Sequence, residues 1–204
     1  MEGDPTSAVF LLVDGKVKLL QVTPQGQQVI HGYVRKGEVF GIVAALNEAL
    51  YPVSAQAIND CLALFWNEED INRLIKDFPQ IAINIARILA QRIQVYQDRV
   101  RELATQRVER RIARTLLRLA QQTGRKINSG VLIDLPLTRQ DLAEMNGTTL
   151  FTVSRTLKQW ESKGLIFSKR EQVIIRYPHG LVSIAEDLGQ DDSSVIALSQ
   201  RPKG

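Results

Sequence analysis

The sequence predicts an α+β fold with three parts: an N-terminal antiparallel β-barrel, a long central helix and a C-terminal winged helix-turn-helix. Short apolar runs separated by turn residues fill the first third of the chain. A helical stripe of apolar residues follows, and two short helical patterns joined at Gly147 precede two more short apolar runs. These patterns are typical of a small antiparallel sheet, of two paired helices, and of a helix-turn-helix with a wing.

The same patterns give the domain organisation. We expect a β-rich domain at residues 1–78, a dimerisation helix at 79–105, a winged helix-turn-helix at 106–188 and a disordered tail at 189–204. A chain of 204 residues with 44% hydrophobic content is long enough to bury two modest cores.

The predicted strands of the first domain are short and apolar, and they cover residues 9–13, 17–22, 27–34 and 62–66. The first two flank Asp14 and Gly15, a pair typical of a β-hairpin turn. We therefore expect these two strands to pair with each other in a small barrel or double sheet. A helix capped by Asn67 and running through Phe78 ends the domain.

An apolar stripe runs along the next predicted helix, at residues 80–104. Its members are spaced four, three, four and three residues apart: Leu89, Ile93, Tyr96, Val100 and Leu103. This spacing pairs two helices along their length, so it predicts a parallel homodimer. The alternative is an ordinary core helix lying on the barrel, because the stripe is only about three heptads long.

A basic helix is predicted at residues 108–121. Its basic residues are Arg110, Arg111, Arg114 and Arg118. Its apolar residues, which we expect to pack behind the winged helix, are Ile112, Leu116, Leu117 and Leu119. Residues 124–130 begin and end with glycine and predict a loop.

The first helix of the predicted helix-turn-helix begins after Thr138, whose hydroxyl can cap it. Leu142 and Met145 then face inward, and Ala143 is small enough for a second helix to cross closely over it. Gly147 allows the positive φ that ends this helix in a sharp turn.

The second helix begins after Thr148 or Thr149, and its stripe of Val153, Leu157 and Trp160 is expected to be buried. The N-terminal part of such a helix enters the major groove of DNA, where an arginine can bind O6 and N7 of guanine. Arg155 is our candidate for that contact. The predicted DNA-binding residues are Thr138, Arg139, Thr149, Leu150, Phe151, Ser154, Arg155, Lys158, Lys169 and Arg170.

Two short strands at residues 166–168 and 173–177 predict a wing, whose charged turn at 169–172 places Lys169 and Arg170 toward phosphates. The alternative is a three-helix packing module in which Arg155 and Lys158 are solvated or pair with Glu161.

The basic residues are concentrated around this motif. Residues 105–177 contain 14 Lys and Arg against 6 Asp and Glu, whereas residues 1–104 contain 10 against 12. A clustered positive field attracts DNA irrespective of its sequence, and such binding weakens as salt rises.

Composition excludes several other classes of protein. No apolar run reaches the roughly 18 residues of a membrane span, and residues 1–5 do not resemble a signal peptide, so we expect a cytoplasmic protein without a membrane partner. Cys61 is the only cysteine, which excludes a cysteine-ligated iron–sulfur cluster and makes a structural zinc site implausible. We find no glycine-rich phosphate loop, metal-ligand spacing or activated nucleophile, and therefore predict no enzyme activity.

The order of these parts resembles the Crp/Fnr superfamily, the bacterial catabolite-activator and fumarate-nitrate regulators. The most specific segments are LTRQDLAEMNGTTLFTVSRTLKQWESKGLI and RRIARTLLRLA, while EGDPTSAVFLLVDGKVKL and GEVFG resemble the strands and ligand cassette of the family's cyclic-nucleotide-binding-like barrel. The resemblance spans Glu2 to about Leu188. It implies a transcription regulator that reads palindromic DNA as a homodimer, and by analogy it directs attention to residues 123–130 for RNA polymerase.

The family usually has some tens of residues before the strand that begins here at Val9. The resemblance therefore implies a barrel without its opening strands, with exposed sheet edges and a partly open core.

The ligand cassette also departs from the family pattern. Where cyclic-nucleotide members carry a Glu for the ribose and an Arg for the phosphate, this chain has Ile42 and Val53, and Tyr96 replaces the polar contact to the base. A buried phosphate without a cationic partner is costly, so we expect that cyclic AMP is not bound in the usual way. The expected effector pocket consists of Gly37, Phe40, Gly41, Ile42, Val53, Ser54, Ala55 and Tyr96.

Phe151 stands where the family's second helix usually has Glu, while the matching Ser154 and Arg155 remain, as in the fumarate-nitrate branch. One guanine contact per half-site is therefore expected to survive. The position read by Glu is expected to change, for example to a thymine whose methyl packs on Phe151 or Leu150.

The signal is left open. A buried and inert Cys61 in a strand is expected rather than a redox sensor, and a surface or hydrogen-bonded His31 rather than a haem ligand. The apolar pocket suits an uncharged or oxo-acid effector, or none. The rival hypothesis is a ligand-binding module that acts through protein contacts instead of DNA.

Overall fold

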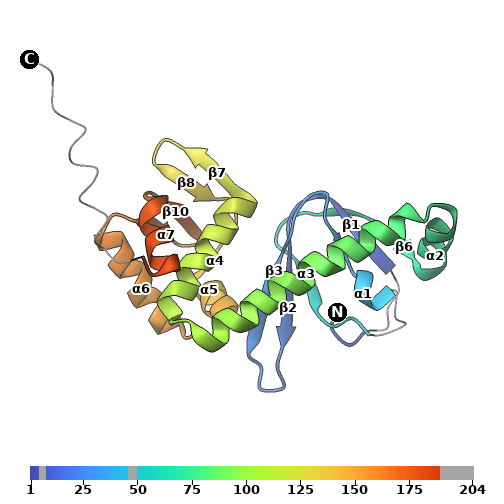
Figure 1. The fold of residues 1–204 in the computed structure, drawn as a ribbon, viewed down its shortest axis with the longest axis horizontal. Helices are drawn as coiled ribbons and strands as arrows, with labels where there is room; N and C mark the ends of the chain where they lie inside the picture. The colour runs from blue at the N-terminus through green and yellow to red at the C-terminus, as the bar shows by residue number, and fades with distance from the viewer. Residues whose placement is uncertain (5–7, 46–49, 189–204) are drawn as a thin grey trace, which may run out of the picture. The chain divides into compact units, whose positions relative to one another are not determined.

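Two compact units make up the chain in this computed structural model, with the boundary between Ala104 and Thr105 (Figure 1). The structure describes residues 1–4, 8–45 and 50–188, so the tail predicted at 189–204 lies outside the described residues. Both units combine helices with antiparallel sheets, and the α+β prediction is confirmed.

The N-terminal unit contains six short strands. They are β1 (Ala8–Asp14), β2 (Val17–Val22), β3 (Gln28–Val34), β4 (Val39–Phe40), β5 (Ser54–Ala57) and β6 (Leu62–Asn67). They form two three-stranded sheets, in the orders β4-β1-β6 and β3-β2-β5, with all pairs antiparallel. Within the described residues no ladder joins the two sheets, so this is a double sheet and not a closed barrel.

The predicted hairpin between the first two strands is wrong. β1 pairs with β4 and β6, whereas β2 pairs with β3 and β5, so the turn at Gly15 leads from one sheet to the other. Gly15 has a φ of +91°, and a Cβ there would lie 2.5 Å from the carbonyl oxygen of Asp60. The glycine is therefore needed for a close backbone approach as well as for the turn.

Three helices accompany these sheets: α1 (Ile42–Ala45), α2 (Glu68–Asp77) and α3 (Gln80–Thr105). The side chain of Asn67 caps α2 by accepting a hydrogen bond from the backbone of Asp70, as the sequence predicts. One apolar core joins β1, α1, α2 and α3 through Val9, Ile42, Ile71 and Ile85. A second, smaller core of Leu12, Val17 and Val34 lies between the strands.

The outer strand of the first sheet is left open. Among the described residues β6 pairs with β1 on one side and with no strand on the other. Leu62, Leu64 and Phe65 on this strand are 59%, 51% and 68% exposed. An apolar edge of this kind leaves unpaired backbone groups beside water-exposed hydrophobic side chains.

The C-terminal unit alternates helices with a single sheet. Its elements are α4 (Val108–Thr123), β7 (Gly124–Ile127), β8 (Gly130–Ile133), α5 (Arg139–Asn146), α6 (Leu150–Ser162), β9 (Ile166–Lys169), β10 (Gln172–Ile175) and α7 (Pro178–Glu186). The four strands are antiparallel in the order β7-β8-β10-β9. The predicted wing is therefore present as β9 and β10.

The loop predicted at residues 124–130 is a β-hairpin instead (Figure 1). Its two glycines allow close contacts: a Cβ at Gly124 would lie 2.0 Å from the carbonyl oxygen of Ala120, and one at Gly130 would lie 2.1 Å from that of Ile175. The glycines fit the hairpin tightly against α4 and β10, and this tertiary role is invisible in the local sequence.

The core of the C-terminal unit lies beneath α4, α5 and α6. Ile112, Leu116 and Leu119 of α4 are at most 2% exposed, whereas Leu117 is half-buried. Three of the four predicted apolar residues of α4 therefore form part of the core behind the helix-turn-helix, and the fourth lies at its margin.

Candidate nucleic-acid interface and ligand cavity

The first helix of the helix-turn-helix begins with a capping box. The hydroxyl of Thr138 accepts a hydrogen bond from the backbone N–H of Asp141 at 2.9 Å, and the Asp141 carboxylate accepts one from the N–H of Thr138, also at 2.9 Å. Two otherwise unpaired helix-end donors are thereby satisfied. At the other end Gly147 adopts the left-handed conformation, with φ 56° and ψ 49°, and the predicted turn is confirmed.

The second helix, α6, has one fully buried face and one free face. Thr149 caps it by accepting a hydrogen bond from the N–H of Thr152. Val153, Leu157 and Trp160 are each 0% exposed, which confirms the predicted stripe. On the opposite face Leu150, Phe151, Arg155 and Lys158 are exposed and Ser154 is half-buried.

Arg155 lies one turn after Phe151, and its guanidinium carbon is 6.0 Å from the centre of the Phe151 ring. Within the described part of the chain Arg155 forms no ion pair. Glu161, the alternative partner weighed from the sequence, instead accepts hydrogen bonds from the backbone and the hydroxyl of Ser168 in β9. The arginine is thus held over an aromatic ring with its donors available.

The wing is fixed to the start of α5. The backbone N–H of Leu137 donates to the carbonyl oxygen of Glu171 at the wing tip, and Arg139 donates to the hydroxyl of Ser168 at 3.4 Å. Lys169 and Arg170, beside that tip, are exposed. These hydrogen bonds join the wing to the helix-turn-helix, and both parts carry exposed basic side chains.

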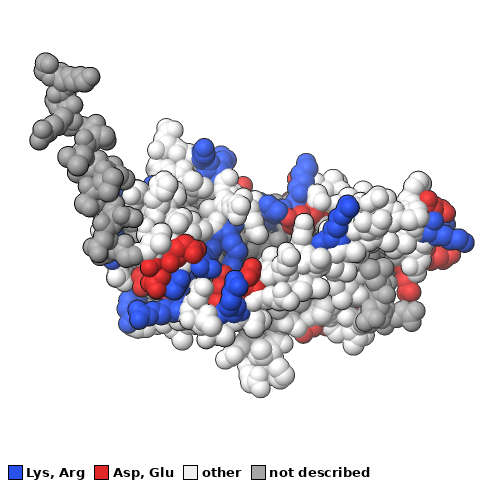
Figure 2. Space-filling model, in the orientation of Figure 1, with Lys and Arg blue, Asp and Glu red and all other residues white. Residues whose placement is uncertain are grey.

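Part of the basic excess of this unit is structural. Arg111 is 9% exposed and donates hydrogen bonds to the carbonyl oxygens of Gln106 and Asn146. Arg110 and Arg114 both donate to the carbonyl oxygen of Ala185 near the end of α7. Figure 2 shows acidic side chains among basic ones on the viewed face of this unit. The charge count alone therefore overstates the basic surface available to DNA.

The predicted dimer stripe on α3 is mostly uncovered in the single chain. Ile93, Tyr96, Val100 and Leu103 are 57%, 47%, 67% and 46% exposed. Leu89, the first member of the stripe, is partly buried and packs on the core of the N-terminal unit. An ordinary core helix would cover these side chains, so their exposure favours helix pairing over the alternative weighed from the sequence, although Ile93 and Tyr96 also border a cavity of the N-terminal unit.

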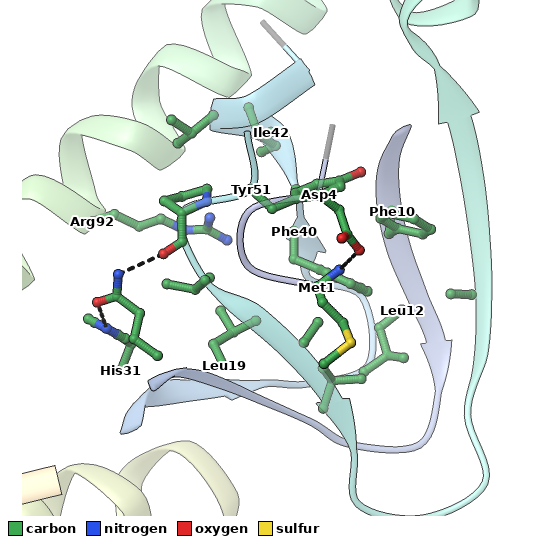
Figure 3. Close-up of a pocket in the computed structure, with 18 of the residues that line it drawn as sticks. Met1, Asp4, Phe10, Leu12, Leu19, His31, Phe40, Ile42, Tyr51 and Arg92 are labelled. Atoms are coloured by element: carbon green, nitrogen blue, oxygen red, sulfur yellow. Dashed lines mark hydrogen bonds and ion pairs between the residues drawn. The ribbon is translucent and has the colours of Figure 1, made fainter. Parts of the chain in front are cut away.

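A large apolar cavity of about 1160 Å³ lies within the N-terminal unit (Figure 3). Of the expected pocket residues, six line it: Phe40, Gly41, Ile42, Val53, Ala55 and Tyr96. Gly37 and Ser54 do not. Gly37 forms a turn with φ +84°, and the hydroxyl of Ser54 accepts a hydrogen bond from the backbone of Glu2. The walls include a stacked pair, Phe10 and Phe40, with ring centres 5.1 Å apart.

Arg92 is a cavity residue that the sequence interpretation missed. It projects from α3 toward the cavity and donates a hydrogen bond to the carbonyl oxygen of Val39. The spacing held a signal for it, because Arg92 lies three residues after Leu89 and four before Tyr96, on the same face of the helix. The cavity therefore has a cation, supplied by α3 and not by the cassette.

His31 also lines the cavity. Its Nε2 hydrogen-bonds to Oε1 of Gln21 at 2.7 Å, and its ring meets the Tyr96 ring edge-on at 6.0 Å. Burial, reinforced by the charge of Arg99, lowers the pKa of His31 below its ordinary value of 6.5, while Glu2 acts in the opposite direction. Described residues provide no cluster of three or more His, Cys, Asp or Glu able to hold a metal ion.

The buried position expected for Cys61 is wrong. The residue lies in the loop before β6, is exposed, and directs its thiol to the carbonyl oxygen of Asn59 at 3.2 Å. It also borders the cavity. The strand begins one residue later, at Leu62, and the Cys61 thiol lies beside Gly15, where an added Cβ would be 2.6 Å from its sulfur.

Comparison with known proteins agrees with both halves of this architecture. Residues 1–78 match the model of the cyclic nucleotide-binding domain, and residues 110–184 match that of the Crp-like helix-turn-helix domain. The cyclic AMP receptor protein of Thermus thermophilus is 31% identical, over 81% of this chain and 73% of its own length. The chain belongs to the Crp/Fnr superfamily.

Other Crp/Fnr proteins extend this result. The global nitrogen regulator of a Nostoc species is 29% identical over 86% of this chain and 80% of its own length. The fold matches that of FixK2 from Bradyrhizobium japonicum with a TM-score of 0.78 and 24% identity, over 90% of this chain and 89% of that one. This Crp/Fnr protein is a sequence-specific DNA-binding transcription regulator. Among the helices described, none is long and apolar enough to cross a membrane.

Proposed function

We propose that this Crp/Fnr regulator binds a two-fold symmetric operator as a homodimer, with α6 of each subunit in adjacent major grooves. The observation that carries the proposal is the face of α6 opposite its buried stripe, where Arg155 and Phe151 remain exposed on a capped, firmly packed helix. Two-fold proteins of this type read half-sites about one helical turn apart.

Dimerisation through α3 is supported by its uncovered apolar side chains. Ile93, Tyr96, Val100 and Leu103 repeat with heptad spacing, and each is at least 46% exposed in the single chain. Packing this stripe against its copy in a second chain removes these side chains from water, which is the main driving force for pairing two helices.

The DNA contacts divide into two kinds. Arg155 is proposed to bind O6 and N7 of one guanine per half-site, worth about 1–3 kcal/mol of discrimination. Phosphate contacts are proposed for Lys169 and Arg170 at the wing, for Lys158 and Arg139, and for the ends of the two helices. The hydroxyls of Thr138 and Thr149 already serve as helix caps, so these residues would approach DNA mainly through the backbone.

The effector is proposed to be a largely apolar molecule with a single acceptor or anionic group. The cavity walls are mostly hydrophobic, Ile42 and Val53 carry no charge, and Arg92 offers donors from α3. Cyclic AMP needs polar partners for its ribose and phosphate that these two positions do not supply. Calorimetric titration with cyclic AMP should show no binding in the micromolar range, and tight binding would refute this part.

Selection from a random pool of duplex DNA, followed by gel shifts at two salt concentrations, tests the DNA-binding proposal. The wild-type protein should recover a palindrome, and Arg155→Ala should bind it at least about tenfold more weakly. Lys163→Ala is the matched control, because it removes one exposed positive charge at the end of α6, away from the groove-facing first turns. An equal loss of affinity in both variants would mean that Arg155 contributes only general electrostatic attraction to DNA.

The family match does not support the rival hypothesis from the sequence, a ligand-binding module that acts through protein contacts instead of DNA. That hypothesis predicts that DNA binding is weak, insensitive to sequence and unaffected by Arg155→Ala. As a regulator that acts by binding DNA, the protein is proposed to work in the cytoplasm without catalysis. Any contact with RNA polymerase, for example through the β7–β8 hairpin, is proposed by family analogy alone.

A further inference from the structure

We infer that α6 reads the C5-methyl group of a pyrimidine next to a guanine, with Phe151 and Leu150 receiving the methyl and Arg155 binding the guanine. This inference rests on the proposed insertion of α6 into the major groove. It implies that thymine and 5-methylcytosine are both accepted at this position, whereas unmethylated cytosine and uracil are disfavoured.

The first observation is the exposure of two large apolar side chains at the start of α6. Phe151 is 73% exposed and Leu150 is 48% exposed, although Val153 and Leu157 on the same helix are completely buried. The fold therefore keeps Phe151 and Leu150 out of its core and directs them to the surface that meets base edges. Their burial against an apolar group of the DNA would be favourable.

The second observation is that the side chains of Phe151 and Arg155 lie close together on α6. The Arg155 guanidinium lies 6.0 Å from the ring centre, and the two residues are one helical turn apart. A guanidinium at this distance is within the range of a cation–π contact, and Arg155 forms no ion pair among the described residues, so its N–H donors are available to bind guanine. A base pair next to that guanine then lies beside the ring.

Groove chemistry identifies the ligand. In the major groove of unmodified DNA, the C5-methyl of thymine is the apolar group that the bases present. A 5-methylcytosine places its methyl at the equivalent ring position, and uracil lacks it while keeping the same hydrogen-bonding groups. An aromatic and an aliphatic side chain without a polar atom can distinguish these bases only by that methyl.

The experiment measures affinity for the selected operator in which single thymines are replaced by deoxyuridine, in symmetric pairs. At one position the wild-type protein should lose about fourfold in affinity per half-site, the value expected for one methyl group no longer buried. At the same position, cytosine should weaken binding about as much as deoxyuridine does, and 5-methylcytosine should recover about fourfold relative to cytosine.

Phe151→Ala completes the test, since a residue that is 73% exposed can be truncated without disturbing the core. This variant should lose most of the preference for thymine over deoxyuridine, with Leu150 retaining the remainder, whereas Lys158→Ala, which lacks a charged side chain on the same face, should keep the full preference. Specific binding that is indifferent to every deoxyuridine and 5-methylcytosine substitution would overturn the inference and leave the proposed function standing. Absence of any selected sequence would defeat the proposed function itself.

Discussion

The two units of this chain differ in how completely they bury their apolar side chains. The C-terminal unit buries Val153, Leu157 and Trp160 completely and caps both helices of its helix-turn-helix. The N-terminal unit instead surrounds a cavity of about 1160 Å³ and leaves Leu64 and Phe65 exposed on an open strand. We infer that the C-terminal unit, which carries the helix-turn-helix, requires one fixed geometry. The N-terminal unit instead retains an open cavity and exposed apolar surface that are available to a ligand or a partner.

A matched pair of core truncations tests this difference most strongly. Leu157 and Leu12 are both 0% exposed, but Leu12 also lines the cavity. We expect Leu157→Ala to lower the free energy of unfolding by about 4–5 kcal/mol and Leu12→Ala by about 2–3 kcal/mol, because packing beside existing free volume is easier to relax. Urea unfolding followed by circular dichroism measures both, and equal losses would argue against a looser N-terminal core.

The capping box gives the next largest effect. Asp141→Ala removes the acceptor for the Thr138 backbone and should destabilise the C-terminal unit by about 1 kcal/mol. Its matched control is Glu144→Ala on the same helix, whose carboxylate accepts only a side-chain hydrogen bond from Gln140 in the described contacts. Thermal unfolding of the two variants compares them, and a control that loses as much as Asp141→Ala would contradict the assignment.

The pH dependence of the N-terminal unit sharpens the comparison further. Because the pKa of His31 is lowered in the folded protein, the unfolded chain binds its proton more readily. This contribution to stability is complete above the unfolded value of 6.5 and is lost as the pH falls through 6.5 toward the folded pKa. Unfolding at about pH 7.5 and about pH 5.5 should show this loss, and His31→Gln should reduce the difference.

The smallest effect is expected on the open strand. Leu64→Gln removes an apolar side chain that is 51% exposed and should change the free energy of unfolding by less than about 0.5 kcal/mol. The same change should lower self-association, as measured by light scattering at increasing concentration. A loss of stability as large as that of a core variant would mean that β6 is covered in solution.

Local signals in the sequence were sufficient for the C-terminal motif. The cap at Thr138 and the left-handed turn at Gly147 depend on neighbours within a few residues, and the buried face of Trp160 follows from its helical spacing with Val153 and Leu157. The structure confirms all three. The α6 face that carries Arg155 follows from the same helical period. These features are predictable because the residues that define them lie on the elements that they shape.

Features that depend on distant contacts were missed or wrong. The partners of β1 and β2 lie far along the chain, so the turn at Gly15 gave no indication that two sheets are involved. Arg111 contributes to the basic excess counted around the motif, yet it is buried and donates to the carbonyl oxygen of Asn146. Arg92 faces the cavity only because α3 packs on the first sheet's core. The spacing of Arg92 with Leu89 and Tyr96 gives the face of the helix on which it lies, but no local pattern encodes which distant residues these side chains contact.

The hydrogen bond of the Trp160 indole links two helices of the C-terminal unit. Its Nε1 donates a hydrogen bond to Glu109 at 3.0 Å, which joins α6 to the first turn of α4. Because the indole is fully buried, a rotation of that turn would either carry α6 with it or break this hydrogen bond. In a Trp66→Phe variant this indole is the remaining tryptophan, and a shift in its emission when an effector binds would report a change around α6.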